Sequence, residues 1–243
     1  RFRNRIESEN PFGYMWECPD YFEIGTKKLL SASVQGLEGG IWDDRNVYQS
    51  GYFEIEGDIL GEYKLSEYHL WDYGFDYYAP QSFETEDGRR IHISWMGMPD
   101  CEEYTNLTIQ MGWQHCFTFP REIFEKDGKI CQRPVRELDE KKHLVSDVKG
   151  MLSSDGYPVY ELEILNIAEN HFISQSKASV SAGRSMRYVE VDEVKNLKIL
   201  ADKSSVEVFV NDGEYVFSTR YYPENHKLLA EAVEAQIRLS EIM

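Results

Sequence analysis

A short acidic and aromatic stretch near the start of the chain has the residue types of a catalytic site. In "GYMWECPDYFEI", residues 13–24, Glu17 and Asp20 lie three positions apart among four aromatic rings. Two interpretations fit this stretch. It is the end of a strand whose polar side chains face water, or it holds a carboxylic acid among aromatic neighbours for use as a general acid. Because a buried strand rarely carries two carboxylates without a use for them, the rest of the chain has to decide.

Strands have to position these acids, since the chain shows the pattern of an all-β protein. Alternating or aromatic-rich runs at 28–34, 48–57 and 89–97 predict strands. Gly-containing turn signals punctuate them, at 38–40, 56–58 and 86–88.

The best-defined element is a hairpin over residues 204–222. Three valines alternate with Glu207 and Phe209, which places the two sets on opposite faces of one strand. Asn211-Asp212-Gly213 supplies the turn, with a positive φ accessible at Gly213.

Two further segments bear on the predicted organisation of the chain: the C-terminal segment and the charged stretch in the middle. Residues 226–243 have a helix-like spacing of apolar side chains. A charged stretch after Pro134 suits an interdomain linker. We therefore predict a first domain over 1–136, a linker over 137–146 and a second domain over 147–243.

Composition and charge limit the classes of partner. The chain has 243 residues, of which 42% are hydrophobic and 14% aromatic, and aromatic rings suit both strands and sugar-binding surfaces. With 43 acidic residues against 26 Lys and Arg, the net charge is −17, which opposes binding to nucleic acid and to anionic membranes. No apolar run approaches the roughly 18 residues of a membrane span.

Four cysteines, Cys18, Cys101, Cys116 and Cys131, contain no CxxC pair. A zinc site is therefore not expected, and the prediction is no metal and no cofactor. Free thiols suit a reducing compartment, so a cytoplasmic location is predicted.

Five segments together resemble glycoside hydrolase family 32, which contains invertases, sucrose-6-phosphate hydrolases and fructanases. They follow in family order at 16–20, 72–83, 93–97, 112–123 and 200–223. The resemblance implies an all-β chain with the later blades of a five-bladed β-propeller followed by a C-terminal β-sandwich. It also implies strands, not a helix, over 226–243.

The same resemblance implies roles for five residues. Glu17 in "WECPD" would be the general acid/base, and Cys18 beside it would place its backbone close to the sugar. Asp76 and Tyr78 in "DYGFDYYAPQSF" would lie near the fructosyl group, and Trp95 in "ISWMG" would offer its ring or indole N–H. Each has a plainer interpretation as well: a small buried filler for Cys18, a turn acid for Asp76, and strand core for Tyr78 and Trp95.

The chain departs from the family at its start. The family's nucleophile lies in an "NDPNG"-like motif and its transition-state-stabilising Asp in an "RDP" motif, and neither is present. We therefore expect these residues alone to be inactive, with a longer parent chain, a partner chain or self-association supplying the missing blades.

The leading hypothesis is a glycoside hydrolase that cleaves β-fructofuranosyl bonds, in sucrose, sucrose 6-phosphate or related fructosides, with retention. The alternative is a non-catalytic carbohydrate-binding remnant of that family. An unrelated β-propeller interaction module is a third hypothesis, which the ordered matches disfavour. The predicted partner is a small carbohydrate.

Overall fold

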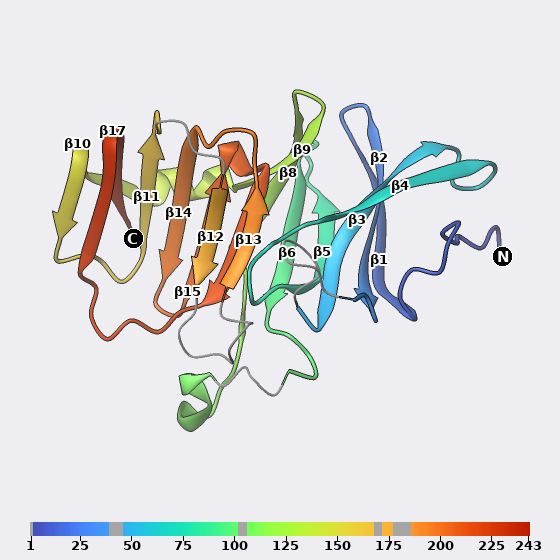
Figure 1. Ribbon diagram of the computed structural model, residues 1–243, viewed down its shortest axis with the longest axis horizontal. Helices are drawn as coiled ribbons and strands as arrows, with labels where there is room; N and C mark the ends of the chain where they lie inside the picture. Colours follow the sequence, from blue (N-terminus) through green and yellow to red (C-terminus); the bar gives the residue numbers. More distant parts are fainter. Residues whose placement is uncertain (1, 39–45, 102–105, 168–171, 177–185) are drawn as a thin grey trace.

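The computed structural model describes residues 2–38, 46–101, 106–167, 172–176 and 186–243, and for 172–176 it describes the backbone alone. Antiparallel sheets follow one another in chain order along the longest axis of the molecule (Figure 1). The N-terminal sheet lies at one end, and strands β10 and β17 lie at the other. The all-β prediction is confirmed.

The first sheet is a meander of four strands in the order β1-β2-β3-β4. Its strands are β1 (Met15–Ile24), β2 (Lys27–Gln35), β3 (Tyr48–Gly57) and β4 (Tyr63–Leu70). The strands predicted at 28–34 and 48–57 are confirmed. The turn signal at 38–40 lies partly outside the described residues.

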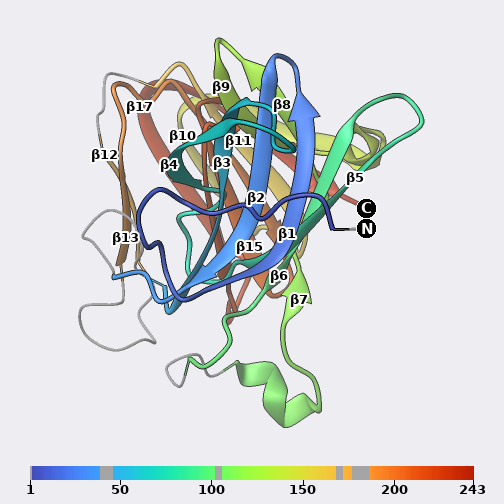
Figure 2. The same cartoon turned by 90° about the vertical axis from the view of Figure 1, so that its right-hand side faces the viewer.

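The second sheet has the order β5-β6-β8-β9, with β7 paired to β6. Its strands are β5 (Tyr78–Glu84), β6 (Arg90–Met96), β7 (Cys116–Phe117), β8 (Arg121–Lys126) and β9 (Lys129–Pro134). The strand predicted at 89–97 is confirmed, and Gly88 takes the positive φ of 81° that its turn requires. Between β6 and β7, the short helix η1 (Leu107–Met111) projects from the body of the molecule (Figure 2).

An aromatic core joins these two sheets. Trp71 lies at its centre, with its ring centroid 4.3 Å from that of Tyr52, and its indole N–H donates to Ser31 Oγ at 2.9 Å. The indole therefore buries its ring without leaving its polar atom unpaired. The core is formed by Phe22, Leu29, Tyr52, Trp71, Tyr77, Ile123 and Ile130. Each such side chain contributes about 1.5–3 kcal/mol on burial.

The C-terminal part is a six-stranded sheet in the order β10-β17-β11-β14-β15-β16, with a separate β12-β13 hairpin. Its strands are β10 (Lys142–Ser154), β11 (Tyr160–Leu165), β14 (Asn196–Asp202), β15 (Ser205–Val210), β16 (Tyr215–Arg220) and β17 (Leu228–Ile242). The hairpin strands are β12 (Phe172–Ser176) and β13 (Met186–Glu190), and valines of β13 and the segment after it pack against the six-stranded sheet.

The predicted hairpin is confirmed as β15 and β16, joined by the turn η3 (Asn211–Gly213). The C-terminal segment is the strand β17, as the resemblance implied and contrary to its helix-like spacing. The strand is interrupted at Glu234, which takes a φ of 61°, and the register against β10 shifts between Glu231 and Gln236. Beyond this irregularity, Ala235, Ile237 and Leu239 are buried at alternate positions, the period of a strand.

The predicted linker, 137–146, contains most of the short helix η2 (Arg136–Lys141) and the start of β10 at Lys142. The division at 1–136 and 147–243 stays a prediction.

A buried ion cluster joins the second sheet to the six-stranded sheet. Glu207 on β15 accepts from Arg121 Nε at 2.8 Å and from Nη2 at 2.5 Å. The remaining guanidinium N–H groups donate to Asp72, Gln132 and Ser218. Burial raises the pKa of both carboxyls, and the guanidinium between them opposes that rise. All five N–H groups of Arg121 therefore have an acceptor.

Replacing the cation should reveal how far the fold depends on this cluster. Arg121→Met would leave two buried carboxyls without their counter-ion, which costs about 3–5 kcal/mol of unfolding free energy. Urea denaturation followed by circular dichroism measures this loss. Lys126→Met, which removes a half-exposed pair with Asp212, is the control and should leave the midpoint nearly unchanged. Equal losses in the two variants would contradict the assignment.

Candidate active site

Two side chains hold one oxygen of Glu17. The Tyr78 hydroxyl donates to Glu17 Oε2 at 2.8 Å, and Gln35 Nε2 donates to the same oxygen at 3.0 Å. Gln35 Nε2 also lies 3.4 Å from the Tyr78 oxygen, so the three groups form a closed set. Glu17 comes from β1, Gln35 from the end of β2 and Tyr78 from the start of β5. The site therefore lies where the first two sheets meet.

The same backbone irregularity occurs on the first strand of both sheets. In "ECPD", Cys18 has a φ of 49°, and the register against β2 shifts between Glu17 and Asp20. In "YAPQ", Ala79 has a φ of 51°, and the register against β6 shifts between Tyr78 and Gln81. Each is a bulge followed by proline, a feature that redirects a side chain at the end of a strand. The two redirected residues, Glu17 and Tyr78, bond to each other.

The bulge also explains why two acids stand three residues apart. Glu17 pairs with Ser33 and Asp20 with Ser31, so both acids share the face of the first sheet that points toward the second. Asp20 is a cross-link between the sheets. Its carboxylate accepts from Ser82 N at 3.1 Å and from Arg90 Nη2 at 3.2 Å. Of Glu17 and Asp20, Glu17 is the one whose second oxygen, Oε1, has no hydrogen-bond donor among the described residues.

The aromatic side chains of residues 13–24 divide between the two faces of β1, and Phe22 lies in the core between the first two sheets. Trp16 lies on the opposite face of β1 from Glu17, where its ring stacks on Phe53 at 5.1 Å. The ring beside Glu17 is that of Tyr78, which in turn lies 5.8 Å from the ring of Tyr48.

Trp95 is the cross-strand partner of Tyr78, and its side chain is half-buried. The ring of His115 meets it edge-on, with the centroids 4.7 Å apart. Trp95 thus extends the surface that begins at Glu17 and Tyr78.

Asp76 lies two residues before Tyr78 but points toward the C-terminal sheet. Its carboxylate accepts from Arg220 N at 2.8 Å and from Thr219 Oγ1 at 3.1 Å, both at the end of β16. Cys18 accepts a hydrogen bond from Gln81 on its carbonyl at 3.3 Å. Of the five predicted site residues, the structure joins Glu17 to Tyr78 directly and places Cys18 and Trp95 beside them. It ties Asp76 to the six-stranded sheet.

The protonation states suit a hydrogen-bonding role for these neighbours. Burial, together with the carboxylate of Glu17, raises the pKa of Tyr78 well above its ordinary value, although Gln35 opposes the rise. Burial and the charge of Glu17 also raise the pKa of the Cys18 thiol. Tyr78 therefore remains an O–H donor to Glu17 at neutral pH.

Sequence reasoning missed Gln35 as part of the site. Its neighbours in the chain offer no polar cluster, because it reaches Glu17 only through strand pairing. For the pairing of Glu17 with Tyr78, the sequence offered one signal. In both "ECPD" and "YAPQ" a small residue precedes a proline in the first strand of a sheet, and that small residue has a positive φ.

The family model described as glycosyl hydrolases family 32 N-terminal domain matches residues 1–134. The model for the family 32 C-terminal region matches residues 75–240. The chain belongs to glycosyl hydrolase family 32.

Relatives of this family 32 chain include the sucrose-6-phosphate hydrolase of Bacillus subtilis, which is 35% identical over 91% of the chain and 52% of the relative. The raffinose invertase of Escherichia coli is also 35% identical, over 87% of the chain and 50% of the relative. The family 32 chain therefore spans about half the length of the curated relatives it matches.

Solved structures show the same architecture. The sucrose-6-phosphate hydrolase of Lactobacillus gasseri superposes with a TM-score of 0.85 at 25% identity, over 97% of this chain and 56% of that one. A family 32 β-fructofuranosidase of Bombyx mori, solved in complex with sucrose, gives a TM-score of 0.78 at 26% identity, over the same shares. The implied fold, propeller blades followed by a sandwich, is confirmed. In the described part of the family 32 chain, no helix has the length and apolarity to cross a membrane.

The shared oxygen of Glu17 gives a test of the site geometry. Gln35→Glu would place a second carboxyl about 3 Å from the first, and repulsion raises the pKa of the introduced carboxyl in the folded state. A glutamate in the unfolded chain has a pKa of about 4.3. Because the pKa of the introduced carboxyl is higher in the folded state, its contribution to the unfolding free energy is fully present below that value and is lost as the pH rises. We expect this variant to lose on the order of 1–2 kcal/mol, relative to the unsubstituted chain, between pH 4 and pH 7.

The matched control is Gln236→Glu, because Gln236 also donates to a carboxylate, Asp147, but in an exposed pair. The urea midpoint of each variant is compared with that of the unsubstituted chain at pH 4 and at pH 7. Between these pH values, the difference should change much less for Gln236→Glu than for Gln35→Glu. A pH-independent difference for Gln35→Glu would contradict the geometry.

Proposed function

We propose that this family 32 chain contributes the general acid/base, Glu17, to an enzyme that hydrolyses β-fructofuranosyl bonds with retention. The supporting observation is the hydrogen bonding of Glu17. Tyr78 and Gln35 both donate to Oε2, which leaves Oε1 as the oxygen that can carry a transferable proton. An acid held in one orientation by neutral donors suits proton delivery to a glycosidic oxygen.

The proposed reaction has two steps. Glu17 protonates the leaving-group oxygen while a carboxylate about 5–5.5 Å away attacks the anomeric carbon, and the deprotonated Glu17 then activates a water molecule. Residues 1–243 span about half the length of the curated relatives. The nucleophile is proposed to come from the part of the family fold that these residues do not cover.

Substrate contacts are proposed for the residues that adjoin Glu17. Tyr78 and Trp95 would face the fructosyl unit, Cys18 would approach it through its backbone, and Asp76 would lie at the base of the site. The substrate class, sucrose, sucrose 6-phosphate or a related fructoside, is supported by the names of the relatives, a sucrose-6-phosphate hydrolase and a raffinose invertase among them. A reducing cytoplasm is the proposed location, and the free thiols of the chain suit it.

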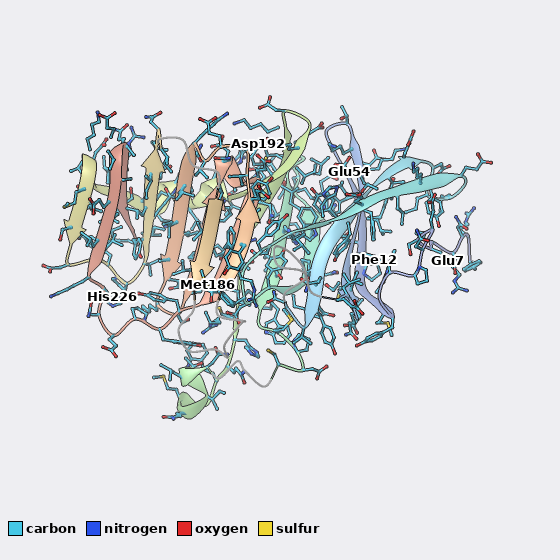
Figure 3. All side chains as sticks on the ribbon, viewed as in Figure 1. Glu7, Phe12, Glu54, Met186, Asp192 and His226 are labelled. Carbon is cyan, nitrogen blue, oxygen red and sulfur yellow. The ribbon has the colours of Figure 1, made fainter. Side chains whose placement is uncertain are left out.

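The outer face of the first sheet is proposed to receive the rest of the propeller. Phe12, Trp16, Phe53 and Tyr68 form a cluster of rings there, with Phe12 5.5 Å from Phe53 and 5.1 Å from Tyr68. Beside them runs a groove of about 660 Å³. The N-terminal segment crosses this face without forming a strand, and Phe12 lies on it (Figures 2 and 3). The opposite face packs on the second sheet, so this face is the one available to another sheet.

Glu17→Gln in the complete protein should lower kcat on sucrose about 10²–10⁴-fold, because an amide keeps the hydrogen bonds but has no proton to transfer. The control is Glu23→Gln, an exposed acid on the same strand, which should retain its turnover. Initial rates of glucose release measure both. If sucrose still binds but neither the variant nor the unsubstituted protein turns it over, the non-catalytic carbohydrate-binding alternative is favoured.

A polypeptide of residues 1–243 alone should release no glucose from sucrose, because Glu17 would have no nucleophile opposite it. It should also associate, since in the described residues no second sheet packs on the outer face of the first sheet. Light scattering and glucose release, with and without the N-terminal part of the propeller supplied separately, test both expectations. A monomer that hydrolyses sucrose unaided would refute the proposal.

A further inference from the structure

We propose that Arg220, at the end of β16, is a positioning residue for the sugar side of the site, through which the C-terminal sandwich holds Trp95 in place. This inference rests on the proposed function for its kinetic consequence. Its structural basis is independent of that function.

Arg220 is a buried cation of an unusual kind. It is 1% exposed, and no carboxylate pairs with it among the described residues. Its Nη2 donates to the Tyr222 hydroxyl at 3.1 Å, and its charge favours the thiolate of the neighbouring Cys116, opposing the rise that burial causes in the pKa of that thiol. No oxygen or nitrogen acceptor in the described part of the chain pairs with Nε or Nη1. Burying a charge without a counter-ion is costly, so another interaction has to offset that cost.

Two aromatic rings supply that interaction. The guanidinium carbon lies 5.5 Å from the ring centroid of Trp113 and 5.4 Å from that of Tyr222. A flat, delocalised cation can stack in this way, and a lysine ammonium cannot reproduce the geometry. The contact therefore fixes Trp113, a residue of the segment that returns from η1 to the second sheet.

That segment needs an external support. Between η1 and β7 it has no regular secondary structure, and β7 itself is two residues long. His115 lies in it, and its ring packs edge-on against Trp95 at 4.7 Å. Arg220, by holding Trp113, sets the position of His115 and hence the orientation available to the Trp95 ring.

A second contact ties the same residue to the acid's partner. The backbone N–H of Arg220 donates to Asp76 at 2.8 Å, and Asp76 precedes Tyr78 by two residues. The side chain of Arg220 therefore supports Trp95 and its backbone supports Tyr78, and these two are cross-strand neighbours. Both contacts originate in the six-stranded sheet and end at the surface beside Glu17.

The test compares Arg220→Met and Arg220→Lys with Arg238→Met, the same change at a half-exposed arginine on β17. In the complete protein, kcat/KM for sucrose should fall about 10–100-fold in both Arg220 variants, since small misplacements of binding groups have effects of that size. Arg238→Met should stay within about twofold. Melting temperatures show whether any loss is one of folding.

A spectroscopic readout separates positioning from general stability. In ¹⁵N spectra of the complete protein, the Trp95 indole N–H resonance, assigned with Trp95→Phe, should move in the Arg220 variants and stay in place in Arg238→Met. Trp113→Leu should move it similarly, and the double variant Arg220→Met/Trp113→Leu should lose no more activity than the worse single one.

An unmoved Trp95 resonance, or activity losses that multiply in the double variant, would overturn the proposal. If the unsubstituted protein fails to hydrolyse sucrose, the proposed function fails, and the resonance shifts still decide the positioning role.

Discussion

The guanidinium of Arg121 is the contact on which the arrangement of the sheets depends. It comes from β8 of the second sheet, and its five N–H groups bond to the loop after β4, to β9 and to both strands of the β15–β16 hairpin. Asp72 extends the same cluster, because it also accepts from Ser218 N and Oγ at 2.8 and 2.6 Å. A buried cluster with this many directional bonds is satisfied in one relative placement of the sheets.

The geometry of the acid follows from that placement. Residues 72–76 run from the Arg121 cluster to Asp76, and their backbone N–H groups donate to β16 at Val216 and Ser218. Tyr78 follows this anchored stretch by two residues and reaches Glu17 across the junction of the first two sheets. A bond of 2.8 Å between side chains on different sheets therefore depends on contacts with a third sheet.

The strands, the hairpin turn and the acid stretch could be predicted because each depends on local patterns. The alternation over 204–222 placed Glu207 opposite the valines, but no local rule showed that this acid is buried, since its partner Arg121 is 86 residues away. Likewise, a spacing of three suggests that Glu17 and Asp20 face opposite ways, and only the bulge at Cys18 puts them on one face. Gln35 and the attachment of Asp76 to β16 are products of tertiary pairing, which the sequence of either segment alone does not encode.

The loop that lies along β16 also bears on how members of this family can be recombined. At Gly74 a methyl group would fall 2.1 Å from the backbone nitrogen and oxygen of Ser218, so the loop and the strand touch backbone to backbone. A chimaera that joins this chain's sheets to a foreign sandwich would break that fit if the cut were made near residue 140, between the two sets of strands. The natural unit of exchange is discontinuous: the sandwich together with residues 72–76 and Arg121, which belong to it by contact although not by position in the chain.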